Sequence, residues 1–329
     1  MKRIAISFLL AFICLVQLFA QKDLVLTYHG SPIDGSLYNK IQYLDSRNGQ
    51  SNLGYVKGGF MSGFNNVVDN PPIPIQLESL LSSMVDQTAL DGTLLLQLRY
   101  YKFYMDNDLG MCKLRINLYH QKADEYYFIN RIDTLIEAKT KEILTKGSDL
   151  FVNSIANNLT MAPVGDVPFS LAQIKDIDNF EKEDIPLYVN KTFKDGLYPT
   201  FESFINQEPD TRELQPKIKK FELKEIKVPG NEPGKWRSLE PKHIYAVVIN
   251  GKLYISYDNK FFLGYFDGND IKFSYQYSPG TGVQGVSLGF GIGSGGYQGG
   301  GIGLILGKRP KETTIMKIDH LDGSAHVAN

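Results

Sequence analysis

The sequence predicts an α+β protein built from two parts, and three observations lead to this prediction. A leucine pattern at helical spacing stands directly before a set of long alternating runs. Short aromatic-rich runs separated by turn residues fill the second half of the chain. The length exceeds what one hydrophobic core usually organises. We therefore expect an N-terminal antiparallel sheet with two helices, followed by a mostly antiparallel β domain that carries a glycine-rich segment.

The first twenty residues have the pattern of a secretory signal peptide. Lys2 and Arg3 precede an apolar run over residues 4–16, and Ala20 is a small residue at the expected cleavage position. The apolar run is too short to stay in a bilayer as an anchor. We therefore predict an exported protein whose mature chain begins at Gln21.

Charge and cysteine content argue against two classes of function. Removal of residues 1–20 takes away two basic residues and no acidic one, which leaves 33 Lys+Arg against 36 Asp+Glu. Nucleic-acid-binding proteins normally carry a basic surplus, so no nucleic-acid partner is expected. Cys112 is the one cysteine beyond residue 20. Neither an internal disulfide nor a thiolate metal site is therefore expected.

A helix and three strands of the first part follow from hydrophobic periodicity. Five apolar residues at helical spacing predict an amphipathic helix that packs on a sheet. They are Leu77, Leu80, Leu81, Met84 and Val85. A run over residues 93–105, a turn at 106–110 and an alternating run over 112–121 predict two long strands, and a third is expected over 126–138. Together these strands form a meander.

The alternating run also predicts which side chains enter the core. Its apolar residues share one face, and its polar residues and one tyrosine share the other. The expected core face is Cys112, Leu114, Ile116 and Leu118, and the opposite face is Lys113, Arg115, Asn117 and Tyr119. Upstream, residues 41–45 and 53–57 are expected to form a hairpin with Asn48-Gly49 as its turn. Downstream, Ser148 is expected to cap a helix that runs to Leu159.

The order of these elements carries a resemblance. An early strand reaching Asp45-Ser46-Arg47, then a leucine-rich helix and a long strand, resembles the small periplasmic lipoprotein domains that accompany envelope transport systems. The resemblance covers residues 35–160. It implies a location in the cell envelope and a role without catalysis.

The second part is predicted to be mostly antiparallel β. We expect an α+β domain over residues 21–162, a polar linker over 163–184 and a β-rich domain over 185–329. Asn250-Gly251 between two apolar alternating runs is a strong indication of a hairpin. Further strands are expected over 261–266 and 271–277.

A second resemblance concerns the start of the β-rich domain. Residues 193–204, with the sequence FKDGLYPTFESF, resemble a segment common in uncharacterised secreted proteins of Bacteroidetes, where short aromatic strands also follow. The resemblance extends over residues 185–329. It implies a lineage and an envelope location and brings no activity with it.

The most unusual stretch is 280–307, in which 13 of 28 residues are glycine. Two glycine series have a spacing of four, which on a helix gives a smooth stripe suited to close contact with a membrane or a partner. These glycines are Gly285, Gly289, Gly293, Gly299, Gly303 and Gly307. A long loop between two strands and a packed glycine-rich strand pair are the alternatives. A G-x-G-x-x-G match inside this stretch is a by-product of its composition.

Residues with catalytic or metal-binding chemistry form no recognisable pattern, so we expect no catalytic residue, no cofactor and no metal. The five histidines lack the spacing of metal ligands. They are His29, His120, His243, His320 and His326. Cys112 is expected to be a core thiol, and an acidic stretch is expected to be a solvated loop. That stretch includes Glu181, Glu183 and Asp184.

These observations favour a non-catalytic exported protein that acts through contact with an envelope protein or the membrane surface. The alternative is a soluble periplasmic module that binds a glycan or small molecule on aromatic side chains, with Trp236, Tyr254 and Tyr257 as its platform. A third hypothesis is an enzyme, such as a hydrolase, with a site that sequence patterns do not reveal. We expect the protein in the periplasm or at the outer membrane.

Overall fold

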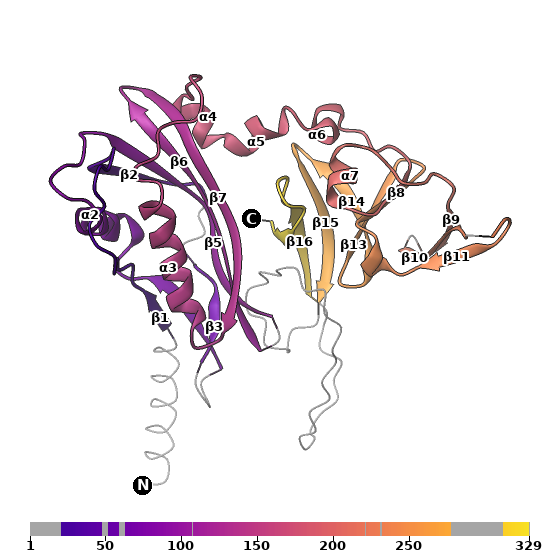
Figure 1. Ribbon diagram of the computed structural model, residues 1–329. Helices are drawn as coiled ribbons and strands as arrows, with labels where there is room; N and C mark the ends of the chain where they lie inside the picture. The colour runs from indigo at the N-terminus through magenta and orange to yellow at the C-terminus, as the bar shows by residue number, and fades with distance from the viewer. Residues whose placement is uncertain are drawn as a thin grey trace, which may run out of the picture. The chain divides into compact units, whose positions relative to one another are not determined.

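The computed structural model describes residues 21–47, 52–58, 63–106, 108–220, 222–230, 232–277 and 312–328. The predicted signal peptide and the glycine-rich segment 280–307 lie outside these residues. The chain divides into two compact units, residues 1–175 and 176–329, which Figure 1 shows in violet and in red to yellow. The division falls inside the expected linker. The fold is α+β with mostly antiparallel sheets, as predicted.

Unit 1 is built on a four-stranded sheet with the order β2-β5-β6-β7. The strands are β2 (Lys40–Asp45), β5 (Thr93–Asp106), β6 (Leu109–Lys122) and β7 (Glu125–Lys139). The predicted meander of β5, β6 and β7 is confirmed, and both of its pairings are antiparallel. β2, however, pairs with β5 in parallel. A parallel pair needs a crossover, and the chain between β2 and β5 supplies one through two further strands and a helix.

Two helices cover one face of this sheet. α2 (Ile73–Met84) and α3 (Ile143–Ala156) share a continuous core with the apolar face of β6. The four β6 residues expected in the core, from Cys112 to Leu118, are fully buried. Burial of each such side chain contributes roughly 1.5–3 kcal/mol, so this face supplies much of the stability of unit 1.

The predicted hairpin between residues 41–45 and 53–57 is wrong. β3 (Tyr55–Lys57) belongs to a second sheet of order β1-β4-β3, with β1 (Gln21–Leu24) and β4 (Phe64–Asp69). Gly54 explains the course of the chain, because it lies against the backbone of Phe103 with φ +94°. A Cβ at Gly54 would lie 1.9 Å from the carbonyl oxygen of Phe103, so only glycine lets this segment approach β5. The expected turn residues lie outside the described residues.

The expected cap at Ser148 is also wrong. α3 begins five residues earlier, at Ile143, and Ser148 lies inside it. The Ser148 hydroxyl donates to the carbonyl oxygen of Val25 over 2.7 Å, so it ties the helix to the N-terminal segment. The helix starts at Ile143 because this side chain packs on Gly110 of β6, where a Cβ would be 2.6 Å from it. Tertiary packing therefore sets the helix start.

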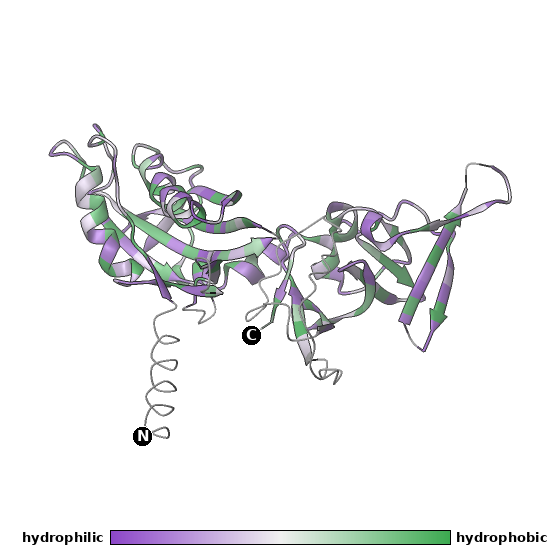
Figure 2. Cartoon of the chain, turned by 90° about the horizontal axis from the view of Figure 1, so that it is seen from below, coloured by the Kyte–Doolittle hydropathy of each residue, from purple (hydrophilic) through white to green (hydrophobic). Residues whose placement is uncertain are grey.

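Unit 2 is built on a seven-stranded antiparallel sheet with the order β17-β16-β15-β14-β13-β12-β8. Its strands are β8 (Gly196–Tyr198), β12 (Ala246–Ile249), β13 (Lys252–Tyr257), β14 (Lys260–Asp267), β15 (Asp270–Tyr277), β16 (Glu312–Ile318) and β17 (Ala325–Val327). The predicted hairpin at Asn250-Gly251 is confirmed, since both residues have positive φ between β12 and β13. Figure 2 shows hydrophobic and hydrophilic residues alternating along the strands, as expected for sheets with one buried face.

A small sheet and short helices complete the architecture. The small sheet has the order β11-β10-β9, with β9 (Gln215–Lys219), β10 (Glu222–Pro229) and β11 (Trp236–Leu239). The short helices are α4 (Leu171–Lys175) in unit 1, and α5 (Ile177–Lys182), α6 (Pro186–Asn190), α7 (Phe201–Ile205) and the 3-10 turn η1 (Pro241–His243) in unit 2. Within the described ranges, no helix has the length and apolar character needed to cross a membrane.

Candidate metal centre

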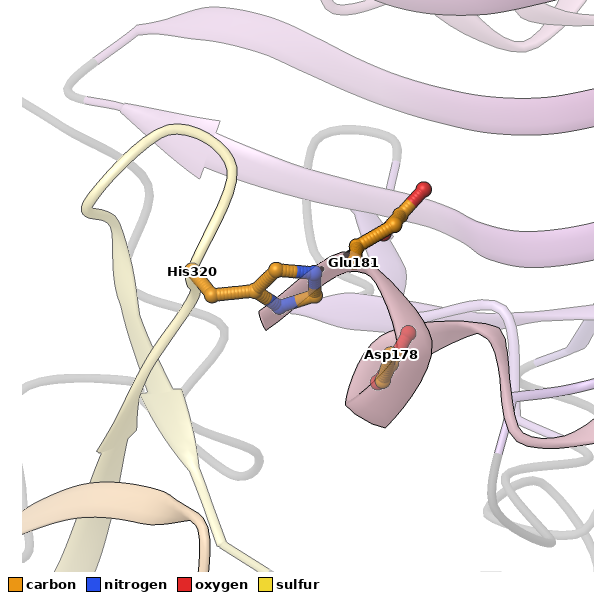
Figure 3. A group of neighbouring side chains, drawn as sticks. All are labelled: Asp178, Glu181 and His320. Carbon is orange, nitrogen blue, oxygen red and sulfur yellow. Dashed lines mark hydrogen bonds and ion pairs between the residues drawn. The ribbon is translucent and has the colours of Figure 1, made fainter. Parts of the chain in front are cut away.

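Helix α5 and the loop after β16 bring three metal-ligating side chains together in unit 2. Asp178 and Glu181 stand three residues apart on α5 and therefore project from the same side of the helix. His320 follows β16, and Figure 3 shows its imidazole directed toward α5. One ligand atom from each of the three residues lies within 4.8 Å of the others.

The imidazole of His320 and the carboxylate of Glu181 are in direct contact. His320 Nε2 lies 2.8 Å from Glu181 Oε2. The His320 side chain is only 3% exposed and that of Glu181 12%, so the contact is shielded from water. An ionised carboxylate can only accept, so Nε2 carries the proton in this contact. A shielded imidazole–carboxylate pair of this kind can hold a proton or a cation.

A buried ion pair fixes α5 in the position that the site requires. Lys182 Nζ lies 2.6 Å from Asp270 Oδ1, and the Lys182 side chain is 4% exposed. Lys317 Nζ also reaches this oxygen, at 3.0 Å. Burial by itself would raise the pKa of Asp270, but the hydrogen bonds and charges of the two lysines outweigh it and hold that pKa below its ordinary value. Asn179 adds a contact with Asn269 over 3.2 Å.

Tyr188 of α6 lies beside this cluster. Its ring is perpendicular to the His320 ring at a centroid distance of 6.4 Å, and Lys182 Nζ lies 5.4 Å from its centroid. Its hydroxyl is buried and has no hydrogen-bond partner among the described residues. Burial, followed by the charges of Asp319 and Asp270, raises the pKa of Tyr188 above its ordinary value. The hydroxyl therefore stays protonated and is available as a donor.

The structure does not bring the expected aromatic platform onto one face. Trp236 lies on β11 and is 38% exposed. Tyr254 is buried between the large sheet and β10. Tyr257, three residues further along β13, packs on the opposite face with Phe262 and other aromatic rings. The glycines expected to contact a membrane or partner lie outside the described residues; they are Gly285, Gly289, Gly293, Gly299, Gly303 and Gly307.

Two further sequence expectations have definite outcomes. Cys112 is a core thiol, as predicted: it is fully buried, and burial raises its pKa. Glu181, in contrast, does not lie in a solvated loop but on α5, where it contacts His320. The sequence contained one indication of this, the Asp-x-x-Glu spacing of Asp178 and Glu181. No local pattern could connect α5 with His320, because 139 residues separate it from Glu181.

Comparisons with known proteins leave the function open. No protein-family model matches the chain, and a search of curated proteins finds no match. One similar solved structure, described as an uncharacterized protein, is 16% identical, with a TM-score of 0.24; the match covers 40% of this chain and 95% of that one. Another, protein XCC0632 from Xanthomonas campestris, of the family DUF330, is 11% identical, with a TM-score of 0.27 and coverage of 49% and 97%. These scores are too low for either likeness to support an argument about this chain.

Proposed function

We propose that the chain is an exported, non-catalytic envelope protein that acts by binding another envelope protein, and that β7 of unit 1 is its docking edge. The observation that carries the proposal is the long outer edge of this strand. β7 has 15 residues and pairs with β6 on one side. Because β7 is the last strand of this sheet, its other side pairs with no further described strand of unit 1.

Only the first part of that outer edge is covered within unit 1. Tyr126 exchanges backbone hydrogen bonds with Phe169, and Val164 donates to the carbonyl oxygen of Phe128. Along residues 130–139, no described segment of unit 1 forms a further strand pairing. An edge of this kind presents backbone N–H and C=O groups in a row, and an extended segment of a partner can add to it as a new strand.

The side chains of this edge suit a selective contact. Leu135 is 43% exposed and offers an apolar anchor. Glu137 is exposed on the same face of β7, and Asp133 is paired with Lys113 and Arg115 of β6. Charges on an edge strand oppose unspecific pairing between copies and favour a partner with complementary charge. We therefore expect the partner to be an extended polypeptide segment.

The sequence supports the proposed location. The signal-peptide pattern, the resemblance of residues 185–329 to secreted proteins of Bacteroidetes, and that of residues 35–160 to periplasmic lipoprotein domains all favour the periplasm or the outer membrane. The glycine series between 285 and 307 would add a second contact with the partner or with the membrane surface.

The docking edge can be tested by photo-crosslinking in native cells. A photoreactive amino acid at Leu135 is expected to give an adduct with a defined envelope protein. Ile75, which is 64% exposed on α2, is the matched control and is expected to give none. If neither position or both positions alike form adducts, β7 is not the docking edge. An alkaline carbonate wash of the cell envelope tests location: release from washed membranes indicates a protein contact, and retention indicates a membrane element.

A further inference from the structure

We propose that Asp178, Glu181 and His320 bind one divalent transition-metal ion, with the ligand preference of Zn²⁺. This inference concerns unit 2 and does not depend on the docking edge of unit 1. Imidazole nitrogen and carboxylate oxygen are ordinary zinc ligands, with bond lengths of about 2.0–2.2 Å. Mg²⁺ and Ca²⁺ prefer sites formed by oxygen alone, so the imidazole favours a transition metal.

The observed separations allow an ion to enter with small side-chain movements. In tetrahedral coordination, ligand atoms about 2.1 Å from the ion lie roughly 3.4 Å apart. The three ligand atoms lie within 4.8 Å of one another, so movements of about 1 Å bring them into place. The His320–Glu181 distance of 2.8 Å would have to increase, since the ion takes the place of the hydrogen bond. The single proton of the neutral ring then resides on Nδ1, which leaves Nε2 free to bind the ion.

Charge and surroundings also favour an ion. Two carboxylates and a neutral imidazole carry a net charge of −2, which a divalent ion neutralises. His320 is buried and Glu181 nearly so, and charged groups in such surroundings are stabilised by a cation. Tyr188 supplies a second observation, because its ring lies edge-on to that of His320 and its buried hydroxyl has no partner among the described residues. Three protein ligands leave at least one coordination position for water, to which a hydroxyl of this kind can bond.

The ion would connect two segments that are far apart in the chain. α5 stands at the start of unit 2, and His320 lies in the loop between β16 and β17. An ion held by both would stabilise the folded unit through mass action, by about 2.7 kcal/mol at a free ion concentration one hundred times the Kd. Binding is therefore expected to raise the unfolding temperature of unit 2.

The test uses the untagged mature protein, residues 21–329, after treatment with a chelator. Calorimetric titration with Zn²⁺ is expected to give one ion per chain, and Ca²⁺ or Mg²⁺ at the same concentration is expected to give none. Co²⁺ is expected to bind with the visible absorption bands of a low-coordinate site. Absence of stoichiometric Zn²⁺ binding would overturn the proposal.

Variants identify the ligands. Asp178→Asn and Glu181→Gln preserve side-chain size and are expected to weaken Zn²⁺ binding at least tenfold each. Glu183→Gln, an exposed acid just beyond α5, is the matched control and is expected to leave affinity unchanged. His320→Ala tests the third ligand, and circular dichroism of each metal-free variant shows whether it has folded. If the two carboxylate variants fold and bind Zn²⁺ as the unmodified chain does, the ion lies elsewhere and the proposal fails.

Discussion

The carboxylate of Asp195 holds the backbone of Gly251. Its two oxygens accept hydrogen bonds from the N–H groups of Asn250 and Gly251, over 2.9 and 2.8 Å. The contact fixes the turn between β12 and β13 to the segment that leads into β8. Both turn residues have positive φ, and the single carboxylate satisfies the N–H groups of both. These charge-assisted hydrogen bonds anchor the turn.

Asp195→Ala is expected to lower the free energy of unfolding by about 1 kcal/mol, because the hydrogen bonds are charge-assisted but exposed. Urea unfolding followed by circular dichroism measures the change. The control is Asp267→Ala, which removes a surface ion pair with Lys272 and is expected to cost less. Equal effects in both variants would contradict an anchoring role for Asp195.

Gly147→Ala is expected to destabilise unit 1 by about 1–3 kcal/mol through overpacking. A Cβ at this position would lie 2.4 Å from Phe103 Cε1 and 2.9 Å from Cys112 Sγ. Denaturant unfolding measures the decrease in the free energy of unfolding. The rate of Cys112 alkylation is an independent measure, since the thiol should react faster in the variant. Lys146→Ala changes an exposed position on the same helix and should leave both quantities nearly unchanged. An equal loss from the two substitutions would exclude overpacking as the cause.

Lys182→Met is expected to lower the free energy of unfolding by about 2–3 kcal/mol near pH 7, since it leaves Asp270 half-buried with Lys317 as its one remaining ion-pair partner among the described residues. The pKa of Asp270 is lower in the folded state, so its contribution is complete above the unfolded value of about 3.9 and is lost as the pH falls. The difference in the free energy of unfolding between the variant and the unmodified chain should therefore shrink toward pH 3. Urea unfolding of both proteins at pH 7 and at pH 3 measures this difference. Lys242→Met, at an exposed pair with Glu240, should cost less than about 1 kcal/mol at either pH.

Lys102→Met is expected to stabilise the protein by about 1 kcal/mol near pH 7. Burial and then the charge of Arg47 lower the pKa of Lys102 to about 8. A lysine with a lowered folded pKa binds fewer protons when folded, so the free energy of unfolding rises from about pH 8 to about pH 10.4. The higher free energy of unfolding of the variant should therefore approach that of the unmodified chain toward pH 10. A constant difference across this range, or the same gain in the exposed control Lys57→Met, would refute this explanation.

Local patterns predicted the elements that pack mainly with their sequence neighbours. The leucines of α2 and the alternation of β6 specify a buried face directly, and Asn250-Gly251 specifies a turn with positive φ. β1 and β4 were not predicted. β4 contains two adjacent asparagines, which are poor strand formers, and β1 has three exposed residues and no alternation to detect.

Elements that depend on distant partners could not be read from the sequence. The parallel pairing of β2 with β5 depends on a crossover, and the close approach of Gly54 to Phe103 is visible only in three dimensions. The candidate metal centre belongs to the same class. Its two acids stand at a regular spacing, but His320 reaches them only because the large sheet returns the chain to α5.

The pairing of β16 with β15 also bears on how freely this chain can vary in length. The two strands are neighbours through six paired positions, although residues 278–311 separate them along the chain. The entropy of closing a flexible loop grows only with the logarithm of its length, so a flexible connection of this length would cost about 2 kcal/mol more to close than one of four residues. Pairing between the strands, and not the connection, therefore fixes their register. A change in the number of residues between Tyr277 and Glu312 is therefore expected to leave the pairing of β15 with β16 in place.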